Sequence, residues 1–139
     1  MATESCNCDG CLDAEMEKEQ GNEYLAMEEI ESAIDFYTQG ISHCCGKNKQ
    51  LMAMLLSNRA TAYYMLNMFE KGISDAQKCV ALSPKWVKAY NRLAACQFSC
   101  QLFKSASVHY SQALLLEPQN KFAVAGFAKS IRRLNEQMR

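Results

Sequence analysis

The sequence predicts an all-α fold, an α-solenoid of three helix pairs followed by a C-terminal capping helix. Three observations lead to this prediction. The 139 residues include only six Gly and two Pro, and Val and Ile are scarce beside Ala, Leu and Met, which favours long helices over strands. Similar residues recur every 34 positions, which indicates stacked repeats. The last unit begins but does not complete, as expected of a helix that covers the open end of such a stack.

The repeat is clearest where identical residues lie 34 positions apart, as in Ala60, Ala94 and Ala128, or in Pro84 and Pro118. A period of 34 residues with two helices per unit is the spacing of tetratricopeptide repeats (TPR). We therefore expect one domain with three TPR motifs in residues 13–119, at about 14–47, 53–86 and 87–120. Residues 120–139 are expected to form the capping helix.

Each repeat is numbered so that its small residue falls at position 8, which makes Ala14, Ala53 and Val87 the first positions. Small residues at positions 8 and 20 let the two helices of a repeat approach closely, and large ones at 11 and 24 fill the space beside them. In the first repeat these include Gly21 at position 8 and Tyr37 at position 24. The first repeat is five residues longer than the others, which lengthens its connection near residues 45–49. Helices are predicted near 13–27, 30–44, 50–66, 69–81, 85–99, 103–115 and 120–137.

Two of these helices have specific signals. Pro84 marks the start of the helix at 85–99, because proline fits the first helical turn. In the capping helix, Ala128 keeps the small position, and an apolar stripe runs from Phe127 to Met138 in steps of four, three and four residues. Arginines on the opposite side give this helix a face toward water.

Residues 1–12 are predicted to be a flexible acidic tail that contains cysteines. Residues 1–17 carry five acids and no Lys or Arg, which leaves fifteen bases and ten acids for the rest of the chain. Cys6, Cys8 and Cys11 could bind a soft metal and recruit His43 or Cys44. Their spacing matches no standard zinc module, however, so we predict no metal and no cofactor.

Composition and motifs exclude several classes of function. A formal net charge of zero argues against bulk nucleic-acid binding. The longest apolar run, residues 51–56, is too short to span a bilayer. No phosphate-binding glycine loop or hydrolase signature is found, so we expect no enzymatic activity. The N-terminus has no secretory signal, and we expect a cytoplasmic protein whose eight cysteines stay reduced.

Donor side chains are predicted to meet in one groove. The first helix of every repeat lines the concave side of the stack, and positions 2, 5, 6 and 9 share one face of that helix. Lys88 and Arg92 lie one turn apart on this face, where two cations repel unless an anion lies between them. With no carboxylate among the matched positions, the predicted donors from three repeats are Lys18, Asn22, Asn58, Lys88 and Arg92.

This donor set suits a carboxylate ligand. Hydrogen bonds to charged groups are the strong ones, at about 1.5–3 kcal/mol each. Lysine offers a point charge, asparagine a neutral amide donor and arginine a fork of N–H groups. Two carboxylates close together, as at a chain end that terminates in Asp, would use all five donors. The sequence therefore predicts capture of a C-terminus.

Three segments carry a resemblance to a known family. Residues 18–22 (KEQGN), 57–60 (SNRA) and 88–92 (KAYNR) resemble the carboxylate-clamp TPR domains of heat-shock protein co-chaperones, over about residues 13–138. The resemblance implies a right-handed α-solenoid that binds the Glu-Glu-Val-Asp C-terminus of heat-shock protein 90, heat-shock protein 70 or both. It implies that Lys18, Asn22 and Asn58 hold the terminal carboxylate, Lys88 the last Asp side chain, and Arg92 the peptide upstream. Contacts to upstream residues are expected from Leu25, Thr61, Tyr64 and Phe98.

Two other functions are compatible with stacked helix pairs. A helical-repeat RNA-binding module would show RNA affinity that falls steeply with salt. A scaffold could instead bind its partner through the convex face or the capping helix. Binding that vanishes when the C-terminus of a peptide is amidated distinguishes the co-chaperone module from both.

Overall fold

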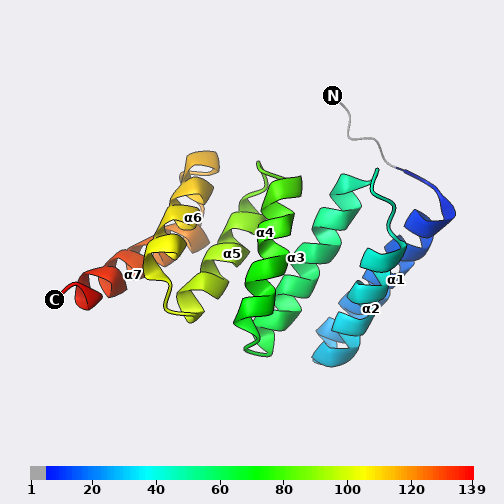
Figure 1. Cartoon of the computed structure of the whole chain (residues 1–139), viewed down its shortest axis with the longest axis horizontal. Helices are drawn as coiled ribbons and strands as arrows, with labels where there is room; N and C mark the ends of the chain where they lie inside the picture. Colours follow the sequence, from blue (N-terminus) through cyan, green and yellow to red (C-terminus); the bar gives the residue numbers. More distant parts are fainter. Residues whose placement is uncertain (1–5) are drawn as a thin grey trace.

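A computed structural model describes residues 6–139, which form seven helices and no strand. The helices follow one another along the long axis of the molecule, from α1 at the blue end to α7 at the red end (Figure 1). Residues 1–5 of the predicted tail lie outside the described residues. The all-α prediction of three helix pairs and a capping helix is confirmed, with bounds α1 Asp9–Ala26, α2 Ile30–His43, α3 Lys49–Met65, α4 Phe69–Leu82, α5 Val87–Ser99, α6 Phe103–Leu116 and α7 Lys121–Gln137.

The helices pack as consecutive pairs. Each first helix contacts its own second helix, and each second helix contacts the first helix of the next pair. In addition, α1 contacts α3, α3 contacts α5, and α5 contacts α7. The first helices and α7 therefore lie next to one another along one side of the stack. No helix within residues 6–139 is long and apolar enough to cross a membrane.

The pattern of small and large residues explains how tightly the pairs pack. Tyr37 is fully buried, and a Cβ atom added at Gly21 would lie 2.5 Å from its ring carbon Cε1. Glycine at position 8 thus makes room for the tyrosine at position 24. A similar contact lies at the C-terminal end, where a Cβ atom at Gly126 would collide with the ring of Tyr110.

The corner between the two helices of a pair has the same backbone geometry in all three repeats. Glu28, Asn67 and Gln101 have φ angles of 63°, 60° and 64°, in the left-handed region. At each corner the amide of the following residue donates to a carbonyl five residues earlier, at 2.8–2.9 Å: Glu29 to Tyr24, Met68 to Tyr63, and Leu102 to Gln97. This pattern is a Schellman cap, formed here without glycine.

Two predicted helix starts are wrong. α1 begins at Asp9, inside the segment predicted as a flexible tail, because Cys8 is extended and its carbonyl accepts from the amide of Leu12 at 3.0 Å. α5 begins at Val87 rather than just after Pro84. The amide of Trp86 donates to the carbonyl of Ser83 at 3.1 Å, so Pro84 lies in a turn.

The five extra residues of the first repeat do more than lengthen a loop. The α2–α3 connection covers residues 44–48, only one residue more than the α4–α5 connection at 83–86. The other four residues extend α3, which begins at Lys49, four residues before position 1 of its repeat. α1 is extended at its N-terminus in the same way, so the first turns of both helices project beyond the regular repeat.

The capping helix packs through most of the predicted stripe, where Phe127, Ile131 and Leu134 are half-buried and Phe127 packs against the core, but two predicted residues do not pack. Ala128 and Met138 are exposed, whereas Ala123 and Ser130 are buried and Gly126 lies against Tyr110. Position 8 of a repeat packs on the second helix of the same unit, and within residues 6–139 no such helix accompanies α7. Ala128 therefore has nothing to pack against, and α7 docks on α6 through other residues.

A buried ion pair within the second repeat is linked to the first repeat by a hydrogen bond. Arg59 on α3 donates through Nε and Nη2 to the two carboxylate oxygens of Asp75 on α4, both at 2.7 Å. Its Nη1 also donates to Oγ1 of Thr38 on α2 at 3.2 Å. The side chains are 16% and 4% exposed for Arg59 and Asp75. One guanidinium thus joins three helices.

Candidate carboxylate-binding groove

Three of the predicted donors face a common pocket. Asn22 from α1, Asn58 from α3 and Lys88 from α5 line a cavity of about 470 Å³. Leu25 and Thr61, predicted as secondary contacts, line the same cavity. The structure therefore brings together residues from three separate repeats, as the position numbering predicts.

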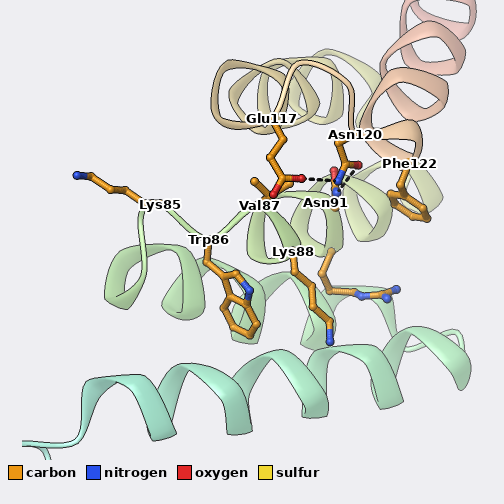
Figure 2. Close-up of a pocket in the computed structure, with 9 residues that line it drawn as sticks. Lys85, Trp86, Val87, Lys88, Asn91, Glu117, Asn120 and Phe122 are labelled. Carbon is orange, nitrogen blue, oxygen red and sulfur yellow. Dashed lines mark hydrogen bonds between the residues drawn. The ribbon is translucent and has the colours of Figure 1, made fainter. Parts of the chain in front are cut away.

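A second pocket, of about 440 Å³, adjoins the first and holds both cations of α5. Lys88 and Arg92 line it, and Lys88 is shared between the two pockets. In Figure 2, Lys88 extends to the opposite side from Glu117 and Asn120. Asn120 accepts a hydrogen bond from Asn91 and donates one to Glu117. Lys88 is therefore not neutralised by the carboxylate that lines its own pocket.

Lys88 and Arg92 form no ion pair with any carboxylate of the described chain. Lys88 is exposed, with Nζ 6.0 Å from the centre of the Trp86 ring. The Arg92 guanidinium lies over the Tyr64 ring at 5.1 Å, and its buried Nε has no hydrogen-bond partner within residues 6–139. Two neighbouring cations without counter-charge, one with an unpaired buried N–H, make a site that favours an anion.

The amide of Asn22 is held in one orientation. Its Oδ1 accepts from the hydroxyl of Tyr37 at 2.6 Å and from Nδ2 of Asn58 at 3.1 Å. Burial raises the pKa of Tyr37 to about 12, so the phenol keeps its proton and donates. Because Oδ1 is occupied twice, the Nδ2 group of Asn22 is left to donate to a ligand.

Lys18 differs from the other predicted donors. Its side chain is 7% exposed, and Nζ lies 2.7 Å from Oε1 of Glu15 and 3.5 Å from Oε1 of Glu19. The prediction of no carboxylate among the matched positions is thus incomplete. Glu15 and Glu19 hold positions 2 and 6 of the first repeat, so the numbering that selects Lys88 and Arg92 in the third repeat also identifies them.

The remaining predicted contacts, Tyr64 and Phe98, line a third pocket of about 380 Å³. Phe122, Gly126 and Lys129 of α7 form its other side. Phe122 is 55% exposed and also lines the second pocket, so the three cavities follow one another along a groove. The sequence did not point to the α7 residues, because the orientation of the capping helix is not given by the repeat period.

Comparison with known proteins agrees with this geometry, although no family model matches the chain. The chain is 34% identical over 115 residues to heat shock protein STI1 of Saccharomyces cerevisiae, which covers 83% of the chain and 19% of that protein. Over 103 residues it is 37% identical to human RNA polymerase II-associated protein 3, covering 74% of the chain and 15% of that protein. It thus spans a fifth or less of these two relatives.

A solved structure decides the family. The first TPR domain of Spaghetti, bound to the HSP90 peptide SRMEEVD, has a TM-score of 0.82 and 34% identity, covering 90% of this chain and 95% of that one. The chain belongs to the TPR domains of the heat-shock co-chaperones. The second TPR domain of human RPAP3, in complex with an HSP70 peptide, is also similar to this TPR domain, with a TM-score of 0.80 and 30% identity, covering 87% and 97% of the two chains.

Proposed function

We propose that this TPR domain is a cytoplasmic adaptor that captures the Glu-Glu-Val-Asp C-terminus of heat-shock protein 90, heat-shock protein 70 or both. The observation that carries the proposal is the pair of cations Lys88 and Arg92, which form no ion pair within residues 6–139. Lys88 also shares a pocket with the amides of Asn22 and Asn58. The peptides bound by the two similar TPR domains support the proposal, since both end in Glu-Glu-Val-Asp. The adaptor acts by binding alone, without catalysis, cofactor, nucleic acid or membrane.

Each donor has a part in this proposal. The terminal carboxylate accepts from Nδ2 of Asn22, from Asn58 and from Lys18. Lys88 binds the side chain of the final Asp, where each charge-assisted hydrogen bond contributes about 1.5–3 kcal/mol. Arg92 binds the peptide further upstream. Apolar upstream side chains pack on Tyr64, Phe98 and Phe122 along the third pocket.

The direct test uses a peptide with and without a free C-terminus. A free-acid Met-Glu-Glu-Val-Asp peptide is expected to bind with a Kd near 1 μM, roughly −8 kcal/mol, because few groups are buried and a flexible tail must be ordered. The C-terminally amidated peptide is expected to bind at least about tenfold more weakly, since it loses the charged acceptor. Isothermal titration calorimetry measures both. Equal affinity for the two peptides contradicts the proposal.

Glu15 is expected to compete with the peptide for Lys18. Glu15→Gln removes the 2.7 Å ion pair and leaves Lys18 with only the 3.5 Å contact to Glu19, so the affinity for the free-acid peptide should rise by about two- to fivefold. Glu31→Gln, on the exposed surface of α2, makes the same change of charge away from the groove and serves as the control. An unchanged or lower affinity in Glu15→Gln, relative to Glu31→Gln, would contradict competition between Glu15 and the peptide for Lys18.

A further inference from the structure

Four cysteines come together at the end of the stack that carries the N-terminus. Cys6 and Cys8 precede α1, Cys11 lies in its first turn, and Cys45 lies in the α2–α3 connection. Their four Sγ atoms all lie within 4.8 Å of one another. The sulfurs of Cys11 and Cys45 are 3.3 Å apart although the residues are 34 positions apart in sequence.

The backbone is built to allow this approach. A Cβ atom added at Gly10 would lie 2.5 Å from the carbonyl oxygen of His43, the last residue of α2. Only glycine lets the first turn of α1 pass so close to this carbonyl. The extra turn of α1 carries Gly10 and Cys11, and it therefore places Cys11 beside the connection that carries Cys45.

Although the spacing of the cysteines in the sequence predicts no metal, we propose from their arrangement in space that Cys6, Cys8, Cys11 and Cys45 form a structural zinc site. The site ties the segment before α1 to the α2–α3 connection. In a tetrahedral Cys₄ zinc site with Zn–S bonds of about 2.3 Å, the sulfurs lie about 3.8 Å apart. The Cys11 and Cys45 sulfurs are 3.3 Å apart and no pair of the four exceeds 4.8 Å, so small rotations of the side chains suffice to reach this value. Each thiol releases its proton to water as its sulfur binds the metal.

The chemistry of the four ligands points to zinc and to a structural role. Thiolates are soft ligands that select zinc over magnesium or calcium. Four protein ligands leave no open position for water or substrate, which distinguishes a structural zinc site from a catalytic one. The groove donors do not belong to this cluster, so the site is independent of peptide binding.

The fourth cysteine of the cluster is neither of the two residues, His43 and Cys44, that the sequence suggested. Nδ1 of His43 lies 2.7 Å and 2.9 Å from the carboxylate oxygens of Glu17, so this ring is already engaged. Sγ of Cys44 lies 3.6 Å and 3.7 Å from the carbonyl oxygens of Cys45 and Asn48. Of the candidates in the connection, Cys45 is the one whose sulfur joins the cluster.

The test measures metal content and ligand identity in the full chain, purified under reducing conditions and equilibrated with zinc. Wild type is expected to retain about one zinc per chain, and Co²⁺ in its place should give thiolate charge-transfer and tetrahedral d–d absorption bands. Cys45→Ser is expected to lower zinc affinity by at least about tenfold. Cys8→Ser should do the same, and because this thiol is exposed, the variant tests the site without disturbing the core.

Two variants serve as matched controls. Cys44→Ser changes the neighbouring buried thiol, and Cys100→Ser changes a half-buried thiol at the end of α5, so both should retain zinc as wild type does. The proposal is overturned if reduced wild type retains no zinc, or if Cys8→Ser and Cys45→Ser bind zinc as tightly as Cys44→Ser. A Cys11–Cys45 disulfide in a chain that takes up no zinc after reduction would assign the cluster to redox chemistry instead.

Discussion

Lys88→Ala is expected to weaken binding of the free-acid Met-Glu-Glu-Val-Asp peptide by about 30-fold or more, a loss of about 2 kcal/mol or more. Lys88 is exposed, lines two of the three pockets and forms no ion pair in the described chain, so its charge is available to the ligand. Arg92→Ala should act in the same direction and also removes the cation–π contact with Tyr64. Isothermal titration calorimetry of wild type and both variants measures the effect.

The melting temperature of Lys88→Ala should stay close to that of wild type. In the peptide-free domain Lys88 and Arg92 repel each other by a few tenths of a kcal/mol, so removing one cation costs little stability. Lys78→Ala, on the exposed surface of α4, removes the same charge outside the groove and should leave peptide affinity unchanged. Undiminished binding by Lys88→Ala, or an equal loss in Lys78→Ala, would exclude a local role for Lys88.

Asp75→Ala is expected to lower the free energy of unfolding by about 3–5 kcal/mol. The substitution leaves the Arg59 guanidinium half-buried between α2, α3 and α4 without its carboxylate, and an unpaired buried charge is costly. Urea denaturation followed by circular dichroism measures the loss.

Two comparisons separate the ion pair from general packing. Glu136→Ala breaks the exposed Arg133–Glu136 pair on α7 and should change stability by less than about 1 kcal/mol. The double variant Arg59→Met/Asp75→Leu replaces both charges by apolar side chains and should recover much of the lost stability. A loss below about 1 kcal/mol in Asp75→Ala would show that water reaches Arg59 and compensates its charge.

Much of the fold and of the groove could be predicted because the period of 34 residues fixes both at once. A residue's position within the repeat determines which face of which helix it occupies. Asn58 and Arg92 hold the same position in successive repeats, so their convergence with Lys88 follows from numbering alone. The ion pairs of Lys18 could be predicted from the same numbering only if acids are considered as well as bases. Glu15 and Glu19 hold positions 2 and 6 of the first repeat, as Lys88 and Arg92 do in the third.

Other features depend on contacts outside the repeat pattern. The choice of Cys45 over Cys44 depends on the path of a short connection and on the close approach of Gly10 to His43. The exposure of Ala128 depends on the absence of a second helix beside α7 in the described chain. In both cases the deciding neighbour lies far away in sequence and does not recur with the period.

The glycine-free corners of the three repeats bear on how such domains diversify. Glu28, Asn67 and Gln101 share one backbone shape although one is acidic and two are amides of different length. A left-handed conformation costs a residue other than glycine roughly 1–2 kcal/mol. The backbone hydrogen bonds at each corner therefore hold the residue in a conformation that its side chain disfavours. The backbone hydrogen bonds thus determine the direction in which the second helix of each pair folds back on the first. Substitutions can then change the groove residues without changing the turn between the two helices of a pair.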